Sequence, residues 1–303
     1  MSRSPEELAG VADVDCTGQQ ALVTGSTSGI GRDAALALGR LGADVIVHGR
    51  DETAGEAVVD EFDGLDADGR FVKADFASVD GVRELAETVR TDTDGVDILV
   101  NNAGGLFREG RLSDLGVEYT FHVNHLSPFL LTTALLGHLA DDARIVTTAS
   151  AAHQGTALDL ERVQDVDRHA SWWAYSHSKL ANILFASELA RRLDATERAI
   201  TSNSIHPGAI PGSGFSRFLP RPLPQLMGGL SAVPGVTTVA DGAAELLFPA
   251  VSPRTADISG RYFVDQQPTT PSPAARDRDN ARRLWEFSAD VLDIEEPLEG
   301  AAT

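Results

Sequence analysis

The sequence predicts a single α/β domain built on a doubly wound parallel sheet of about seven strands, with helices on both faces. Two observations support this prediction. Short apolar runs alternate along the 303 residues with longer stretches of helical period, and the short runs are rich in Val, Ile and Leu. Strands buried on both faces have that composition, and strand–helix alternation is typical of a parallel sheet with crossover helices.

Seven apolar runs are predicted strands, and five helical patterns lie between them. We expect strands at Gln20–Thr24, Asp44–His48, Arg70–Ala74, Asp97–Val100, Arg144–Thr148, Thr201–Ile205 and Arg261–Val264. We expect helices at Gly31–Leu41, Val79–Arg90, Leu126–Leu139, Tyr175–Leu193 and Val239–Leu247. No linker divides this pattern, so residues 19–290 form one predicted domain.

Three segments do not follow the alternation. Residues 1–18 are expected to be a loosely attached N-terminal arm, and residues 291–303 a solvated acidic tail. Residues 209–235 contain five prolines and five glycines among bulky apolar side chains. Loops of this length are commonly functional, and the apolar residues favour a lid over a substrate.

The charge balance excludes several classes of partner. The chain has 25 basic and 45 acidic residues and a net charge of −20, whereas nucleic acid and anionic membranes are bound by basic surfaces. No apolar run approaches the ~20 residues that cross a bilayer, and the first residues lack a signal-peptide core. Cys16 is the one cysteine, so no internal disulfide is expected. We therefore expect a cytoplasmic protein with a small-molecule substrate and without membrane insertion.

The composition also bears on habitat. Lys73 and Lys179 are the only lysines among the 25 basic residues, and a GC-rich genome would explain that bias. Codon usage does not explain the excess of carboxylates. Concentrated salt screens the repulsion within such a surface, so the composition favours a salt-adapted protein from a halophile over an acidic mesophilic one.

A glycine-rich turn follows the first predicted strand and opens the first predicted helix. In this turn Gly25 allows a sharp bend, Gly29 lets backbone amides approach a pyrophosphate, and Gly31 lets the helix pack closely on the strand. A turn that merely ends a strand has similar glycines, but the strand–turn–helix setting favours nucleotide binding at the helix N-terminus. The predicted cofactor contacts are Gly25, Ser26, Thr27, Ser28, Gly29, Ile30 and Gly31.

The end of the second predicted strand bears on which nucleotide binds. NAD-binding sheets of this type end that strand on an acidic residue that holds the ribose 2′-hydroxyl. Gly49 has no side chain for that bond, and Arg50 is suited to pair with a 2′-phosphate. Asp51 lies one residue further on and keeps NAD(H) as the alternative. NADP(H) is therefore the preferred prediction.

Two further motifs lie at strand and helix positions suited to a cofactor. Asn102, Ala103 and Gly104 follow the fourth predicted strand, where small residues leave room for the adenosine part. Tyr175 and Lys179 are four residues apart on a predicted helix and therefore share one face. A nearby ammonium favours phenolate, so we expect Lys179 to lower the pKa of Tyr175.

These motifs resemble a known family in their order along the chain. TGSTSGIG, NNAG, YSHSK and the sequence His206-Pro207-Gly208 are similar to those of the short-chain dehydrogenase/reductase superfamily, over about residues 18–290. Within that superfamily the chain most resembles the retinol dehydrogenase-like branch. The resembling stretches are Val123–Leu126, Phe129–Thr132, Tyr175–Asn182, Gly260–Phe263 and Arg282–Trp285. The resemblance implies a Rossmann fold, which agrees with the predicted sheet, and a homo-oligomer.

The resemblance also implies a catalytic set. Tyr175 would act as the general acid in carbonyl reduction and as the base in alcohol oxidation. Lys179 would hold the nicotinamide ribose, Ser150 would hydrogen-bond the substrate oxygen, and Asn124 would anchor a relay water. Such donors are needed because hydride transfer to a carbonyl builds negative charge on oxygen.

The resemblance assigns cofactor contacts outside the glycine-rich turn as well. Asp75 would accept from the adenine amino group, with Phe76 beside it, and Pro207 and Gly208 would line the nicotinamide pocket. One departure is Ala149, which stands where many members have a second serine before Ser150. Another is Gly212, where a Thr or Ser is usual; Ser213 is the candidate replacement.

Other side chains near these motifs have less specific patterns. His122 and His125 have a spacing that can bind metal, but no second ligand pair accompanies them, so no metal site is predicted. His153 and His206 are expected to shape the pocket. Trp172 and Trp173 either form an apolar pocket wall or pack under the preceding loop.

The sequence therefore predicts an NADP(H)-preferring oxidoreductase that interconverts an apolar aldehyde or ketone and its alcohol. An NAD-dependent alcohol dehydrogenase is the alternative within enzymes. A cofactor-binding regulator without turnover is the alternative outside them, although an intact set of Ser150, Tyr175 and Lys179 speaks against it.

Overall fold

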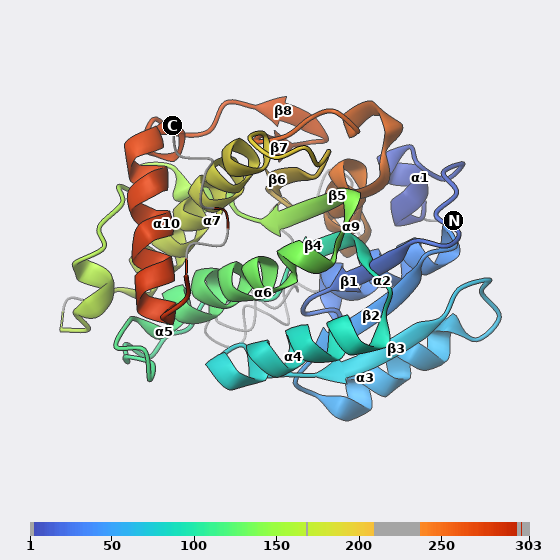
Figure 1. The fold of residues 1–303 in the computed structure, drawn as a ribbon, viewed down its shortest axis with the longest axis horizontal. Helices are drawn as coiled ribbons and strands as arrows, with labels where there is room; N and C mark the ends of the chain where they lie inside the picture. Colours follow the sequence, from blue (N-terminus) through green and yellow to red (C-terminus); the bar gives the residue numbers. More distant parts are fainter. Residues whose placement is uncertain (1–2, 168, 209–236, 296–297, 299–303) are drawn as a thin grey trace.

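One sheet of eight strands forms the centre of the chain in the computed structural model (Figure 1). The structure describes residues 3–167, 169–208, 237–295 and 298. The strand order is β3-β2-β1-β4-β5-β6-β7-β8, and all neighbours are parallel except β7 and β8. The strands are β1 (Gln20–Val23), β2 (Asp44–Gly49), β3 (Gly69–Lys73), β4 (Val96–Asn101), β5 (Leu139–Thr148), β6 (Thr201–Ile205), β7 (Tyr262–Val264) and β8 (Gln267–Thr269).

Helices cover both faces of this sheet and separate two apolar layers. One layer is formed with α4, α6, α7 and α10, and the other with α1, α2, α3 and α9. The helices are α1 (Pro5–Ala9), α2 (Gly29–Arg40), α3 (Glu52–Val59), α4 (Val79–Asp92), α5 (Tyr119–Phe121), α6 (Ser127–Leu135), α7 (Ser171–Leu193), α9 (Val239–Val251) and α10 (Arg278–Leu292). The predicted doubly wound α/β domain is confirmed.

The seven predicted strands are all present, and an eighth extends the sheet. β8 follows β7 in an antiparallel hairpin whose turn residues Asp265 and Gln266 have φ angles of 51° and 58°. The prediction missed this strand because it has three residues, all exposed, and therefore no apolar pattern.

Several helices differ from their predictions, and two of these differences concern the sheet and the end of β2. The helix predicted at Leu126–Leu139 ends at Leu135, because the chain from Leu139 onward pairs with β4 through the register Val96↔Leu139, and β5 is correspondingly longer. α3 was not predicted. Its N-terminus is capped by Asp51, whose carboxylate accepts from the amide of Ala54 at 3.1 Å.

The N-terminal segment is packed against the domain, in contrast to the expected loose arm. Ala9, Val11 and Cys16 are at most 2% exposed within the apolar layer that contains α2 and α9. Glu6 of α1 also forms an ion pair with Arg40 at 2.7 Å. Burial raises the pKa of the Cys16 thiol to about 11, which makes this cysteine a poor nucleophile.

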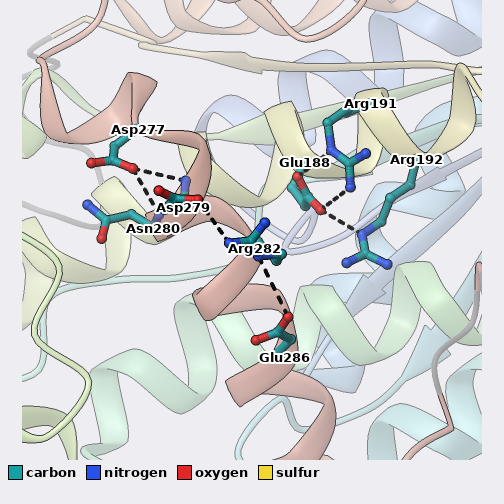
Figure 2. A network of polar contacts seen from close by, with 8 residues as sticks. All are labelled: Glu188, Arg191, Arg192, Asp277, Asp279, Asn280, Arg282 and Glu286. Atoms are coloured by element: carbon teal, nitrogen blue, oxygen red, sulfur yellow. Dashed lines mark hydrogen bonds and ion pairs between the residues drawn. The ribbon is translucent and has the colours of Figure 1, made fainter. Parts of the chain in front are cut away.

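The C-terminal helix α10 packs against α7, close to an ion pair that Glu188 and Arg192 form within α7 (Figure 2). Glu188 and Arg192 are 2% and 3% exposed, and Arg192 Nε donates to Glu188 Oε1 at 2.8 Å. The Arg192 guanidinium lies 4.4 Å from the ring of Trp285 on α10. Because α10 continues to Leu292, the acidic tail begins later than residue 291. The predicted lid, residues 209–235, lies outside the described residues, as do Gly212 and Ser213.

Candidate active site

The predicted site residues lie at the carboxyl edge of the parallel sheet. The strand order reverses direction between β1 and β4, and this switch point is where open α/β sheets bind their ligands. The glycine-rich turn leaves β1 at this edge, Asn102–Gly104 follow β4, Ser150 follows β5, and Pro207 and Gly208 follow β6. The fold therefore brings motifs from four strands to one edge.

The glycine-rich turn fits closely under the segment after β4. A Cβ atom on Gly31 would lie 2.4 Å from Asn102 Nδ2 and 2.5 Å from the Gly25 carbonyl oxygen. Gly25 has a φ of +66°, and its own Cβ would lie 2.8 Å from the Cα of Ala103. The close packing predicted for Gly31 is therefore present, and Gly25 meets both a conformational and a steric requirement.

Hydrogen bonds hold the turn and the β4 segment in place. Asn102 Nδ2 donates to the Thr24 carbonyl oxygen at 2.9 Å, and the amides of Asn102 and Ala103 donate to Thr24 Oγ1 at 2.9 and 3.0 Å. Ser26 is fully buried, and its hydroxyl donates to the Val23 carbonyl and accepts from the His48 amide. The Ser26 side chain thus joins the turn to the ends of β1 and β2.

The N-terminus of α2 is open toward the edge of the sheet. The helix begins at Gly29, two residues earlier than predicted, and its N-cap Ser28 is exposed and makes no side-chain capping hydrogen bond. The first amides of α2 therefore have no capping partner among the described residues. Such amides, together with the helix dipole, suit a phosphate group.

The end of β2 has the arrangement predicted for the ribose position. Gly49 is the last residue of β2, and a Cβ there would lie 2.4 Å from Thr27 Cγ2, so a larger side chain would require the Thr27 side chain to move. The Arg50 guanidinium is 65% exposed and lies 3.8 Å from Asp75, which is itself 51% exposed. The Asp51 carboxylate is engaged as the N-cap of α3. Phe76 is buried against the His48 ring at 4.7 Å, so its side chain belongs to the core.

Tyr175 and Lys179 share one face of α7, as predicted. Lys179 is 4% exposed, and its Nζ donates to the Thr148 carbonyl oxygen at 3.0 Å and lies 5.7 Å from the centre of the Tyr175 ring. Burial lowers the pKa of Lys179 to about 8. Asn182, one turn further along α7, donates to the same Thr148 oxygen at 3.0 Å. Sequence reasoning missed Asn182 as part of the site, although its spacing of three from Lys179 places it on the same face.

The pKa of Tyr175 differs from the expected direction. Burial raises the pKa of the phenol, and a hydrogen bond with Ser150 lowers it in part. The expected lowering by Lys179 is thus not what sets the pKa of Tyr175; burial of the phenol is the largest cause. In the protein alone the phenol therefore stays protonated at neutral pH.

Asn124 connects the β4 segment to α7. It lies in a π-helical turn, His122–Leu126, between α5 and α6. Its Oδ1 accepts from the Gly105 amide at 2.9 Å, and its Nδ2 donates to the Gly105 carbonyl at 2.8 Å and to Ser178 Oγ at 2.9 Å. A Cβ on Gly104 would lie 2.7 Å from Asn124 Oδ1 and 3.8 Å from Lys179 Nζ. Widened helical turns of this kind are frequent at functional sites.

The two tryptophans occupy different environments. Trp172 is 58% exposed, and its ring centre lies 6.0 Å from that of Tyr175. Trp173 stacks on His177 at 4.7 Å and under the Arg162 guanidinium at 3.9 Å, so it packs beneath the preceding loop. Of the two, only Trp172 is exposed beside the candidate site.

The described residues hold no cluster of three or more potential metal ligands. His122 and His125 are buried in the π-helical turn, and burial lowers their pKa values to about 4 and about 3. His125 Nε2 contacts Ser288 Oγ of α10 at 2.9 Å. Within the described part of the chain, no helix combines the length and the apolar composition that crossing a membrane requires.

Comparison with known proteins identifies the family of the chain. The family model described as short chain dehydrogenase matches residues 19–218. Retinol dehydrogenase 14 of Mus musculus is 35% identical over 292 residues, which cover 91% of this chain and 86% of that protein.

Two solved structures extend the agreement to the fold. An uncharacterized protein from Mycobacterium paratuberculosis superposes with a TM-score of 0.75 at 29% identity, covering 97% of this chain and 99% of the other. A short chain dehydrogenase from Burkholderia cenocepacia in complex with NADP superposes with a TM-score of 0.65 at 28% identity, covering 86% and 99%. The chain thus belongs to the short-chain dehydrogenase family of oxidoreductases and, within it, is similar to the retinol dehydrogenases.

Proposed function

We propose that this oxidoreductase transfers hydride between NADP(H) and an apolar aldehyde or ketone, or its alcohol. The observation that carries the proposal is that Ser150 at the end of β5 lies with Tyr175 and Lys179 of α7, next to Gly104 after β4. A phenol, a hydroxyl and an ammonium meet there at the edge of the sheet. Such a set can protonate an oxygen on which negative charge develops.

The residues at this edge fit a dinucleotide. The uncapped amides at the start of α2 suit the pyrophosphate. Asn102 and Ala103, after β4, pack directly against Gly31 and Gly25 and thereby fix the shape of the glycine-rich turn. Asp75 is half-exposed beside Arg50 and is available to the adenine. Pro207 and Gly208 follow β6 and would line the nicotinamide side. When bound, NADP(H) supplies or accepts the hydride.

The preference for NADP(H) rests on the end of β2. Arg50 is exposed and available to a 2′-phosphate. Gly49 has no side chain and lies against Thr27, and the Asp51 carboxylate accepts a hydrogen bond from the Ala54 amide at the start of α3. No carboxylate is thus left at the position that holds a ribose 2′-hydroxyl in NAD-binding sheets. The Burkholderia cenocepacia relative was crystallised with NADP, which agrees with this preference.

The chain's own groups would move the proton as follows. In reduction, the Tyr175 hydroxyl donates its proton to the substrate oxygen, and burial keeps that proton in place at neutral pH beforehand. The Ser150 hydroxyl donates a hydrogen bond to the same oxygen. Lys179, with a pKa of about 8, carries the nearest ammonium, and Asn124 holds the backbone around it. In oxidation the proton moves in the opposite direction.

An apolar substrate is favoured by the exposed Trp172 ring beside Tyr175. Ligand sites are lined mainly by hydrophobic and aromatic side chains, so an exposed Trp ring beside the candidate site suits an apolar ligand. The substrate class is therefore proposed as aldehydes and ketones with an apolar substituent.

The proposal is tested by following NADPH oxidation at 340 nm with a panel of apolar aldehydes and ketones. We expect turnover in the wild type, and we expect Tyr175→Phe to reduce kcat about 100- to 10,000-fold while NADPH still binds, because the ring remains and only the transferable proton is lost. Trp173→Phe, a change of comparable size on the buried side of α7, is the control. Wild-type turnover in Tyr175→Phe would reject the assignment, and NADPH binding without turnover of any carbonyl would favour the regulator.

A further inference from the structure

His153 is a buried histidine with a partner on each ring nitrogen. Its side chain is 0% exposed. The amide of Ser272 donates to Nε2 at 3.1 Å, and Nδ1 lies 2.7 Å from the carbonyl oxygen of Ser150. An amide nitrogen can only donate, so Nε2 must be unprotonated. Nδ1 therefore carries the hydrogen and donates it to the Ser150 carbonyl, which identifies the tautomer.

This pair of hydrogen bonds connects Ser150 to a distant part of the chain. Ser272 lies between β8 and α10, 119 residues away from His153 along the sequence. The same Ser150 carbonyl also accepts from the His153 amide at 3.2 Å, and Ser150 Oγ accepts from the Ala152 amide at 3.2 Å. The ring of His153 packs edge-on against Tyr262 of β7 at 5.2 Å.

The His153 ring therefore links the turn after β5 to Ser272 and to Tyr262 of β7. Ser150 precedes a single 3-10 turn, Ala151–His153, and such a short turn leaves the direction of the Ser150 side chain dependent on its backbone. The His153 ring restrains that backbone at the carbonyl, and Tyr262 and Ser272 restrain the ring. Burial lowers the pKa of His153, so the neutral ring that these bonds require is the stable form.

We propose that His153 is a positioning residue that directs the Ser150 hydroxyl toward the substrate oxygen and Tyr175, by fixing the Ser150 carbonyl to the Ser272 amide. This inference rests on the proposed function for its effect on turnover. Its structural content, the direction of the Ser150 hydroxyl, can be measured without turnover. The segment between β8 and α10 would thus help to position Ser150, although none of its residues lies in the candidate site.

The sharpest test removes the link at its far end. Ser272→Pro deletes the amide hydrogen that His153 Nε2 accepts, whereas Ser272→Ala keeps it and is the matched control. We expect Ser272→Pro to lower kcat about 10- to 100-fold, because small misplacements of catalytic groups have effects of that size. The KM for NADPH should be unchanged, and the primary isotope effect with deuterated NADPH should increase. Ser272→Ala should resemble the wild type in all three.

A second variant acts at the ring itself and covers a failure of Ser272→Pro to fold. His153→Phe retains a ring against Tyr262 but removes both hydrogen bonds, and His153→Asn restores an amide donor for the Ser150 carbonyl. We expect the same fall in kcat in His153→Phe, with partial recovery in His153→Asn. Wild-type kcat in folded, NADPH-binding His153→Phe would overturn the inference.

A titration distinguishes this inference from the proposed function. The Tyr175 phenolate can be followed by ultraviolet absorbance, with the Tyr175→Phe spectrum subtracted to remove the other two tyrosines. The Ser150 hydrogen bond lowers the pKa of Tyr175, so His153→Phe should raise that pKa. An unchanged Tyr175 titration would refute the inference whether or not the enzyme turns over. A raised pKa in a protein without turnover would leave the inference standing and reject the proposed function.

Discussion

Replacing Arg50 by Glu tests the basis of the NADP(H) preference. Arg50 is 65% exposed, and its nearest acidic partner, Asp75, is 3.8 Å away and 51% exposed. Arg50 is therefore only weakly engaged in the protein and free to turn toward a phosphate. Gly49 has no side chain, and the Asp51 carboxylate accepts from the Ala54 amide at the start of α3. Neither residue would therefore replace Arg50 as a cation at the end of β2.

The magnitude follows from the exposure of the site. Two unit charges about 4 Å apart interact by ~1 kcal/mol in water and by ~4 kcal/mol in a partly shielded site. Because Arg50 is 65% exposed, its interaction energy with a phosphate lies near the value in water. The Glu substitution both removes this attraction and adds a repulsion of similar size, which gives about 2–4 kcal/mol. The affinity for NADPH relative to NADH should then fall by about 30- to 1,000-fold.

The assay measures the dissociation constants of NADPH and NADH from tryptophan fluorescence for both proteins at one salt concentration, since salt screens the interaction. Arg70→Glu is the matched control. It carries the same charge change, on β3, where Arg70 is paired with Asp92 at 2.6 Å and lies away from the carboxyl edge. An unchanged ratio of NADPH to NADH affinity in Arg50→Glu, or an equal change in Arg70→Glu, would show that Arg50 does not set the preference.

Three further predictions concern packing, pH and salt. Gly31→Ala should weaken NADPH binding and destabilise the fold by about 1–3 kcal/mol, because the added methyl group would lie 2.4 Å from Asn102 Nδ2 and 2.5 Å from the Gly25 carbonyl oxygen. Thermal melting with and without NADPH measures both effects, and wild-type stability of the variant would contradict this prediction. Burial raises the pKa of Glu245 in the folded chain to about 7, above its ordinary 4.5, so its contribution to stability is present below pH 4.5 and is lost as the pH rises to 7. Glu245→Gln, which can still accept from the Gln266 amide, should therefore raise the melting temperature at pH 8 and leave it nearly unchanged at pH 4.5, and equal effects at both would contradict the assignment. With a net charge of −20, the protein should lose stability below ~0.5 M salt, and a salt-independent melting temperature would contradict salt adaptation and favour the acidic mesophilic alternative.

Several features of the fold and the site were predictable because they depend on local patterns. Apolar runs identified seven strands, since strands buried on both faces need such residues, and the spacing of Tyr175 and Lys179 placed both on one face of α7. The glycine-rich turn was recognisable because its glycines meet steric requirements between neighbouring segments. The strand β8, by contrast, is short and exposed and has no apolar pattern to detect.

The features that could not be predicted depend on contacts between residues distant in the chain. The direction of the Tyr175 pKa shift follows from how deeply α7 is buried, and the sequence contains no measure of that depth. Likewise, the contact of Asp51 with the Ala54 amide depends on an unpredicted helix, and the closeness of Thr27 to Gly49 depends on how two separate segments pack.

The class of fold, the order of the motifs and the chemical types available at the site follow from the amino-acid sequence, because periodicity and residue type are local properties. Which groups face one another depends on the folded chain: Lys179 and Asn182 share the Thr148 carbonyl, and the Ser150 carbonyl is linked through His153 to the Ser272 amide. These pairings join segments up to 119 residues apart. They exist because the packing of helices on the twisted sheet brings those segments within hydrogen-bond distance, and no local pattern records that distance.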